Sequence, residues 1–253
     1  MIKVEKLQKK FAAVTAVNEV SFTAESGVIT GLLGPNGAGK TTTIRMIGTL
    51  IDIDAGRATI DGVNVASDPD GARRAAGLLT DSRGLYTRMT ARENIRYYAA
   101  LRGVSIARSE QTLARFVAWL DMKDILDRRC DGFSQGERMK VAIVRALIHE
   151  PANVILDEPT NGLDVMSTRA LREFIKRLKA EGQTVMFSSH VMQEVAALCD
   201  RIVIIARGRV TAEGTTAELL DMSGKTNLED AFIALSETGE TDHTHHTQHQ
   251  EAA

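Results

Sequence analysis

A glycine-rich stretch, Gly34–Thr41, carries the residues best suited to chemistry in this sequence. It reads GPNGAGKT and matches a phosphate-binding pattern in which glycines, a lysine and a threonine stand at fixed spacing. Glycine lets the backbone come close to a polyphosphate, so that N–H groups surround the phosphate oxygens. Lys40 would bring a positive charge to the β- and γ-phosphates, and the Thr41 hydroxyl would be a ligand for Mg²⁺.

The flanking sequence separates a phosphate site from a glycine-rich turn that binds nothing. The apolar run at 28–33 is typical of a buried strand, and isoleucines recur at helical spacing over 41–50. A strand, a glycine loop and a helix N-terminus together make an anion site. We therefore predict that the chain binds a nucleoside triphosphate. The residues expected to hold it are Gly34, Pro35, Asn36, Gly37, Ala38, Gly39, Lys40, Thr41 and Thr42.

Two adjacent carboxylates, Asp157 and Glu158, follow the apolar run Val154–Leu156. They would stand at the C-terminal end of a strand, where ligands of open α/β sheets gather. We expect Asp157 to hold Mg²⁺, directly or through water. Glu158 should point the other way, as neighbours on a strand do, and assist a water in line with the γ-phosphate. The alternative is a pair of exposed acids without function.

Three further side chains have both a structural and a functional interpretation. A strand at 77–81 is predicted to end on Asp81, and a strand at 184–189 is followed by His190. A single histidine there is often structural, but its place in a series of polar strand ends leaves a functional role open. Phe11, between two N-terminal strands, is either a core aromatic or a flat ring on which an adenine base stacks.

The segment Phe133–Glu137 leads into a helix predicted over 138–148. Ser134 and Glu137 have the spacing of a capping box, so Ser134 can be a helix cap and no more. A capped helix N-terminus beside a glycine is also an anion site, and the two interpretations are compatible. Residues 161–164 are predicted to form a turn before another helix.

The remaining pattern predicts an α/β fold with a helical insertion from about 82 to 150, where Thr90 and Glu93 form a second capping box. From about residue 236 the composition turns to Thr, Glu, Gln and His, which predicts disorder. Metal capture by the histidines there and a solvated tail both stay open. Further strands are expected at 2–7, 20–22, 201–205 and 209–214. Residues 57–65 contain Asp61 and Gly62 between two short β-type stretches, which predicts a hairpin.

Composition narrows the class of protein. The 253 residues suffice for one large domain or two small ones, and the net charge of −2 gives no electrostatic reason to expect nucleic acid. No apolar run reaches about 18 residues, so we do not expect a membrane span, and the first residues do not resemble a signal peptide. Cys130 and Cys199 are expected to be reduced thiols of a cytosolic protein.

Taken together, these motifs resemble the nucleotide-binding subunit of ABC transporters over nearly all of residues 1–222. Gly34–Thr41 is similar to the family's Walker A motif, and Val154–Glu158 to its Walker B motif with the catalytic glutamate. His190 is similar to the switch histidine, and Phe11 lies where the family places its adenine-stacking aromatic. Asn161–Asp164 resembles the D-loop. The segment that resembles the family's signature sequence consists of Phe133, Ser134, Gln135, Gly136 and Glu137.

Three residues depart from the family pattern. Gln135 stands in place of the first glycine of the signature, and Glu137 in place of its final glutamine. Asp81 stands where the Q-loop usually has glutamine. An aspartate can ligate Mg²⁺ or its water, but it cannot donate a hydrogen bond when it is ionised.

The resemblance implies a P-loop NTPase fold of the ABC ATPase type, with a RecA-like core, an N-terminal antiparallel β subdomain and a helical subdomain. The ATPase domain would cover 1–222, its helical subdomain about 82–150, and 223–253 would be a short C-terminal segment with a disordered, histidine-rich tail. ATP and Mg²⁺ are the implied cofactors. The implied metal ligands are Thr41, Asp81 and Asp157.

The resemblance also implies a mechanism. Two copies would meet head to tail, so that each ATP lies between the phosphate loop of one copy and Ser134 and Gly136 of the other, with Asp164 crossing the interface. His190 would hydrogen-bond the γ-phosphate and, with Glu158, orient the attacking water. ATP would close the pair and hydrolysis would open it.

The implied partner is a separate transmembrane permease contacted by residues 81–98, which places the chain on the cytoplasmic face of the cell membrane as a peripheral subunit. Residues 34–43 and 227–232 resemble exporters of the ABC-2 type. The stretch around Asp81 and the short C-terminal region resemble their sodium-efflux (NatA-like) branch. Export of drugs, lipids or polysaccharides stays open.

The alternatives are a soluble ABC-type ATPase acting on ribosomes or nucleic acid, and a binding module that does not hydrolyse ATP. A single Walker A motif speaks against the first, because ribosome-acting relatives usually carry two such domains in one chain. Intact Lys40, Asp157, Glu158 and His190 speak against the second.

Overall fold

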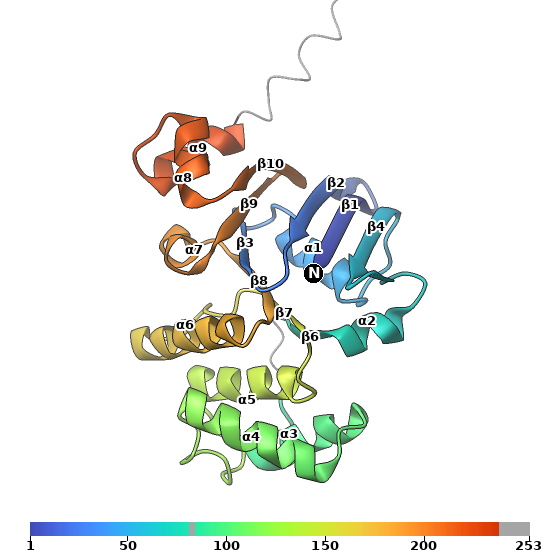
Figure 1. Cartoon of the computed structure of the whole chain (residues 1–253), viewed down its shortest axis with the longest axis vertical. Helices are drawn as coiled ribbons and strands as arrows, with labels where there is room; N and C mark the ends of the chain where they lie inside the picture. Colours follow the sequence, from blue (N-terminus) through green and yellow to red (C-terminus); the bar gives the residue numbers. More distant parts are fainter. Residues whose placement is uncertain (81–83, 238–253) are drawn as a thin grey trace, which may run out of the picture.

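Two β-sheets and the helices around them make up residues 1–80 and 84–237, the part of the chain that the computed structural model describes (Figure 1). No helix in these residues is both long and apolar enough to cross a membrane. The strands are β1 (Ile2–Phe11), β2 (Val14–Ala24), β3 (Ile29–Leu33), β4 (Ala55–Ile60), β5 (Val63–Asn64), β6 (Ala76–Leu79), β7 (Asn153–Leu156), β8 (Thr184–Ser189), β9 (Arg201–Ala206) and β10 (Arg209–Gly214). The helices are α1 (Lys40–Ile47), α2 (Pro69–Ala75), α3 (Ala91–Leu101), α4 (Ile106–Leu120), α5 (Gln135–Leu147), α6 (Val165–Ala180), α7 (Met192–Leu198), α8 (Thr216–Ser223) and α9 (Leu228–Glu237).

The six-stranded sheet, of order β10-β9-β3-β8-β7-β6, brings the functional loops to one edge. Every residue of β3, β7 and β8 is buried, as expected of parallel strands covered on both faces. Leu33 pairs with Ser189, and Leu156 with Phe187, in parallel register. The loops that follow these three strands therefore leave the sheet at the same edge.

The four-stranded antiparallel sheet, of order β2-β1-β4-β5, packs against α1. Along β1, Ile2 and Val4 are buried while Lys3 and Glu5 are exposed, as in a strand with one buried face. The predicted hairpin at 57–65 is formed by β4 and β5. Its two turn residues, Asp61 and Gly62, have φ of 49° and 81°, as a type I′ turn requires.

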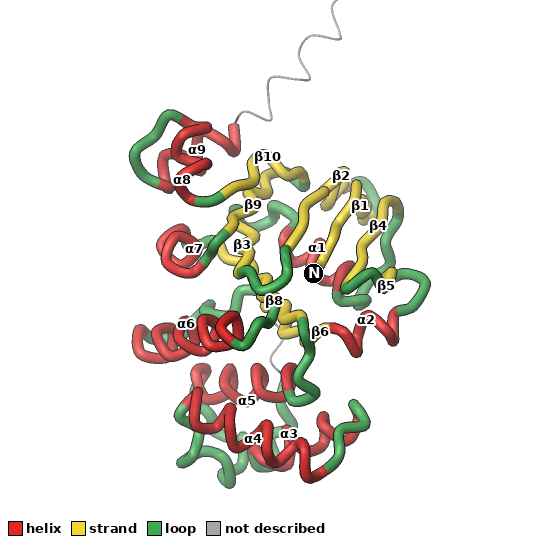
Figure 2. The backbone as a smooth tube through the Cα atoms, viewed as in Figure 1, coloured by secondary structure: helices red, strands yellow, loops and turns green. Residues whose placement is uncertain are grey.

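The helical insertion predicted between the strands is formed by α3, α4 and α5, which lie together at one end of the molecule (Figure 2). Thr90 and Ser134 cap α3 and α5 through the two predicted capping boxes. Helix α5 begins at Gln135, earlier than expected, because the residue after an N-cap already has helical geometry. Phe116 of α4 contacts Phe174 of α6 and so joins this layer to the core.

The C-terminal helices extend the main core. Helix α9 buries Leu228, Phe232 and Leu235 in the same apolar cluster as Phe187 of β8. The division expected after residue 222 falls inside α8, so packed structure continues past it. The histidines of the terminal stretch lie outside the described residues.

His149 makes the stability of the fold depend on pH. Its ring nitrogen Nε2 lies 3.2 Å from the carbonyl oxygen of Ala76, and burial together with the nearby charge of Arg102 lowers its pKa from 6.5 to about 4. As the pH falls below 6.5, the ordinary pKa of histidine, His149 binds a proton in the unfolded chain but not yet in the folded chain. The free energy of unfolding therefore decreases from about pH 6.5 down to about pH 4.

We expect His149→Gln to weaken this pH dependence, because a glutamine amide can reach the Ala76 carbonyl without titrating. Urea unfolding at pH 7 and pH 5 measures the effect. The wild-type chain should lose more free energy of unfolding between the two than the variant, and equal losses would contradict the assignment.

Candidate active site

The glycine-rich loop after β3 has a backbone that only glycine fits at two positions. A Cβ on Gly34 would lie 2.2 Å from the carbonyl oxygen of Ile205, and one on Gly39 would lie 2.5 Å from that of Ala16. Gly39 also has a φ of 103°. Gly39 is the N-cap of α1 and has no side chain that could accept a hydrogen bond from the first turn. The N–H groups of this kind of helix end are available to bind an anion.

Lys40 folds back into this loop. Its Nζ donates to the carbonyl oxygens of Gly34, at 2.7 Å, and Pro35, at 3.2 Å, and lies 3.3 Å from Oε1 of Glu158. The side chain is only 5% exposed, so its charge is confined to the space inside the loop. Of the other loop residues, Ala38 is buried, Thr42 is half-buried, and Pro35, Asn36 and Gly37 are exposed.

Thr41 and Asp157 meet at the floor of the site. The Thr41 hydroxyl donates to Oδ1 of Asp157 at 3.1 Å, and the hydroxyl of Ser188 donates to the same oxygen at 2.7 Å. Asp157 is 1% exposed. The two residues expected to hold Mg²⁺ therefore contact each other, Thr41 from α1 and Asp157 from the end of β7.

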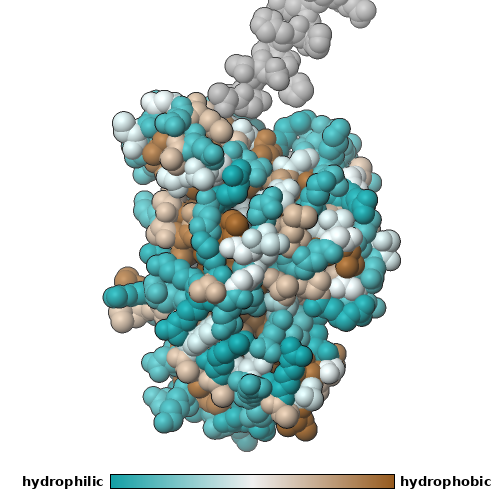
Figure 3. Space-filling view, in the orientation of Figure 1, coloured by the Kyte–Doolittle hydropathy of each residue, from teal (hydrophilic) through white to brown (hydrophobic). Residues whose placement is uncertain are grey.

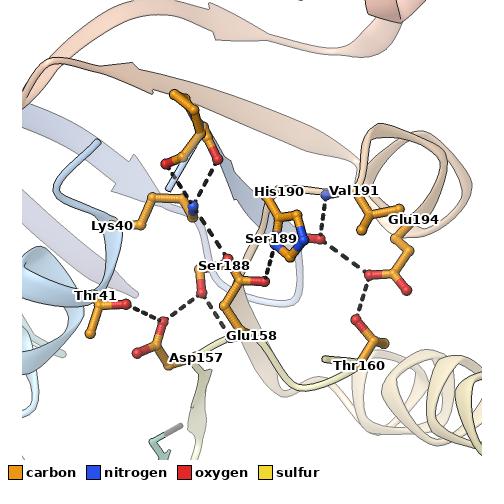
Figure 4. A network of polar contacts seen from close by, with 12 residues as sticks. Lys40, Thr41, Asp157, Glu158, Thr160, Ser188, Ser189, His190, Val191 and Glu194 are labelled. Carbon is orange, nitrogen blue, oxygen red and sulfur yellow. Dashed lines mark hydrogen bonds and ion pairs between the residues drawn. The ribbon is translucent and has the colours of Figure 1, made fainter. Parts of the chain in front are cut away.

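The carboxylate of Glu158 lies beside the same site as Asp157 but contacts different residues, namely Lys40 and His190. Both residues follow the end of β7, and Glu158 has a left-handed backbone with φ of 44°, so strand alternation does not apply to it. Its N–H donates to Oγ of Ser188 at 2.9 Å. Figure 4 shows its carboxylate between Lys40 and His190.

His190 follows β8, and its Nδ1 lies 2.9 Å from Oε2 of Glu158. The imidazole is 40% exposed, which is unlike a structural core histidine. Lys40, Glu158 and His190 thus form one chain of polar contacts beside the glycine loop, built from three loops that follow three neighbouring strands. Asp81, expected at the end of a fourth strand, lies outside the described residues.

Phe11 lies at the β1 end of the β1–β2 hairpin and is 48% exposed, so its interpretation as a core aromatic is wrong. The ammonium of Lys9 lies 5.6 Å from the ring centroid. Ala16, on β2 of the same hairpin, touches the glycine loop at Gly39. The structure therefore presents an exposed aromatic ring on an element that borders the phosphate loop.

The residues that resemble the signature and the D-loop contact each other. Nε2 of Gln135 donates to the carbonyl oxygen of Asn161 at 3.2 Å. A Cβ on Gly136 would lie 2.6 Å from Oγ of Ser167, in the first turn of α6. Ser134, Gln135 and Asn161 are all exposed. The N-terminal ends of α5 and α6 thus form one exposed surface.

Helix caps organise this surface. Ser134 and Glu137 bond reciprocally, and Glu137 also pairs with Arg128 at 2.8 Å. Asp164 caps α6, and because the N–H and hydroxyl of Ser167 donate to its carboxylate, its pKa lies below the ordinary value. Phe133 is 4% exposed and lies beneath Arg128, so its ring supports the loop from inside.

Three residues of this site were not predicted. Ser188 joins Asp157 to the backbone of Glu158, and Thr160 and Glu194 form a buried hydrogen bond next to it. The pair of serines that ends the otherwise apolar strand at 184–189 was the available signal for Ser188. Glu194 looks in sequence like any polar residue of a surface helix.

A sequence profile of one protein family, described as ABC transporter, matches residues 17–161. The chain belongs to the ABC transporter family. This ABC ATPase therefore binds and hydrolyses ATP, and its fold is the P-loop ABC fold that the motifs implied.

Individual relatives agree with this assignment. The chain is 43% identical to the ABC transporter ATP-binding protein NatA of Bacillus subtilis (strain 168) over 234 residues, which cover 90% of this chain and 94% of that protein. It is 34% identical to the linearmycin resistance ATP-binding protein LnrL of the same organism over 239 residues, covering 94% and 76%. A solved ATP binding subunit of an ABC transporter superposes with a TM-score of 0.86 at 31% identity, covering 94% and all of that chain.

Proposed function

We propose that this ABC ATPase works as a pair of copies that drives an exporter through a separate transmembrane subunit. The observation that carries the proposal is the contact chain Lys40–Glu158–His190 beside the glycine loop. It places a phosphate-binding cation, a carboxylate and an imidazole around one point, which is what hydrolysis of a γ-phosphate needs.

In this proposal the loop from Gly34 to Thr42 holds the triphosphate, and Phe11 stacks on the adenine. The exposed ring of Phe11 on a hairpin that touches the loop supports this geometry. Base–aromatic stacking of this kind contributes about 1–3 kcal/mol per base.

The donor set at the floor of the site fits Mg²⁺. A hydroxyl and a carboxylate are the hard oxygen ligands this ion prefers, and Thr41 and Asp157 place both within 3.1 Å of each other. Asp81 would be a third ligand. When bound, the ion would neutralise charge on the phosphates.

Hydrolysis then requires a water opposite the leaving oxygen of ADP. One carboxylate oxygen of Glu158 is held by His190 and the other faces Lys40. Phosphate oxygens would compete for the Lys40 ammonium and leave the second oxygen to accept a proton from the water. The new P–O bond forms as the bond to the β-phosphate oxygen breaks, which gives ADP and phosphate.

The exposed surface at the start of α5 and α6 fits a second copy. Figure 1 shows α5 below the β6–β7 end of the six-stranded sheet, whereas α1 lies between this sheet and the four-stranded sheet. Ser134 is exposed at the N-cap of α5, so it is accessible to the phosphate loop of another chain. Ser134 and Gly136 would then meet the γ-phosphate of the other copy, with Phe133, Gln135 and Glu137 in the same signature segment and Asp164 at the interface.

The surface proposed for the transmembrane subunit is a cleft formed by α1, α2, β4, β6 and β7, with Arg102 at the end of α3 also in its lining. Its volume is about 330 Å³, with Ile47, Ile60, Leu78 and Ile155 among its apolar lining and Arg73 and Arg102 among its polar lining.

Exposed apolar side chains continue this surface onto the helical layer. Tyr97 and Leu101 of α3 are 40% and 64% exposed. Figure 3 shows the hydrophobic residues on the visible face as small separate groups on a mostly hydrophilic surface. This docking would hold the chain at the cytoplasmic face of the membrane. Because NatA is among its relatives, sodium ions are one candidate cargo, beside drugs, lipids and polysaccharides.

The test is affinity purification of the tagged chain from its native membranes with a mild detergent. We expect one integral membrane protein to co-purify, and Arg102→Glu to reduce its yield at least about tenfold by reversing a charge in the cleft. Arg74→Glu, an exposed neighbour on α2 outside the cleft lining, is the matched control and should retain the partner. Equal retention by both variants, or ribosomal proteins in place of a membrane protein, would contradict the proposal.

A further inference from the structure

Glu194 is a buried carboxylate that touches neither the glycine loop nor the Lys40–Glu158–His190 chain. It belongs to α7 and is 6% exposed. Its Oε2 accepts hydrogen bonds from the hydroxyl of Thr160, at 2.5 Å, and from that of Ser189, at 3.2 Å (Figure 4). Arg172 of α6 lies 3.7 Å from its other oxygen.

One of these bonds fixes the loop that carries Glu158. Thr160 is two residues further along, with a proline between them. The N–H of Asn161 donates to the carbonyl oxygen of Glu158 at 3.2 Å, and that of Leu163 donates to the carbonyl oxygen of Thr160 at 3.0 Å. Holding the Thr160 side chain therefore holds this compact turn, with Glu158 at its beginning.

The other bond fixes the turn that carries His190. The hydroxyl of Ser189 donates to Glu194 and accepts from the N–H of Val191 at 3.0 Å. His190 lies between these two residues, so both of its neighbours are held by one serine hydroxyl. Its Nδ1 then meets Oε2 of Glu158 at 2.9 Å.

We infer that Glu194 is a positioning residue for ATP hydrolysis, holding the Glu158 loop and the His190 turn in register through the hydroxyls of Thr160 and Ser189. The inference rests on the proposed roles of Glu158 and His190. Glu194 itself lies outside the reacting groups and acts only through the two hydroxyls.

Burial of a carboxylate is costly, and such a group is retained where several donors compensate it. Here both hydroxyl donors come from the segments that must be aligned. A shift of about 1 Å between catalytic groups can lower a rate about a hundredfold. Because Oε2 of Glu194 holds both segments, losing either of its hydrogen bonds should lower the rate of hydrolysis.

Two nearly isosteric variants, Thr160→Val and Ser189→Ala, test the inference because each removes one donor and leaves the carboxylate. We expect each to lower kcat about tenfold while the Kd for a fluorescent ATP analogue changes less than about twofold. Ser109→Ala is the matched control. It removes a buried hydroxyl that donates to Ile106 within α4, far from this network in the chain, and should leave kcat unchanged.

Changes at Glu194 distinguish positioning from simple packing. Glu194→Gln keeps an oxygen that can accept from both hydroxyls, so it should retain more of kcat than Glu194→Ala. In the Glu194→Ala background, Thr160→Val and Ser189→Ala should have almost no further effect, because the hydroxyls act through the missing carboxylate.

The possible outcomes separate this inference from the proposed function. If Glu158→Gln leaves hydrolysis unchanged, the role of Glu158 itself is wrong. If Glu158→Gln abolishes hydrolysis while Thr160→Val and Ser189→Ala keep the wild-type kcat, only the role of Glu194 is overturned. Equal losses of kcat and ATP affinity in both hydroxyl variants would also overturn it, since they indicate general damage to the fold.

Discussion

Replacing Glu158 with Gln is expected to lower ATP hydrolysis by about 10²–10⁴-fold, the usual contribution of a general base. Glutamine has nearly the same shape as glutamate, so the contacts of residue 158 with Ser188 and His190 can persist. Its amide cannot accept the proton of the attacking water. Steady-state phosphate release and a fluorescent ATP analogue measure hydrolysis and binding separately, and binding should remain.

The same variant should accumulate as an ATP-bound dimer, because ATP closes the proposed pair and hydrolysis opens it. Size-exclusion chromatography with ATP and Mg²⁺ would show the change. Glu173→Gln is the matched control: Glu173 is an exposed residue of α6, 3.1 Å from Lys176, and its loss should change neither turnover nor assembly. Unchanged turnover in Glu158→Gln would refute the assigned role of Glu158.

Replacing Lys40 with Ala is expected to weaken ATP binding about 10- to 100-fold, since hydrogen bonds to charged groups contribute about 1.5–3 kcal/mol. The reason is the position of the ammonium, which is enclosed by the carbonyl oxygens of Gly34 and Pro35 where a triphosphate would lie. Removing it also leaves the carboxylate of Glu158, 13% exposed, without this nearby cation.

Titration of the same fluorescent ATP analogue measures this change in affinity. Lys176→Ala removes an exposed lysine of α6 and should bind normally. An unchanged affinity in Lys40→Ala would count against the glycine loop as the triphosphate site, whatever happened to turnover.

Sequence patterns predicted much of the fold because local chemistry determined it. The strand at 2–7, the turn at Asp61 and Gly62 and the two capping boxes depend on residues close in the chain, and all are present. Ends of elements were less predictable. Helix α1 was expected to reach residue 50 but ends at Ile47. Gly48 and Thr49 after it form a turn.

The site shows where sequence reasoning stops. The spacing in the glycine loop and the strand-end acids identified Lys40, Thr41 and Asp157, whose contacts come from loops that parallel strands bring together. The reason given for the direction of Glu158 does not apply, because this residue follows the strand and has a left-handed backbone. Glu194 was missed because its importance comes from two hydroxyls that are near it only in the folded chain.

The most direct test of the account is the structure of the Glu158→Gln variant grown with ATP and Mg²⁺. The account predicts a head-to-tail pair with the triphosphate against residues 34–42 of one copy and Ser134 of the second copy within hydrogen-bond distance of the γ-phosphate. A triphosphate bound elsewhere, or a γ-phosphate that no second copy approaches, would contradict it.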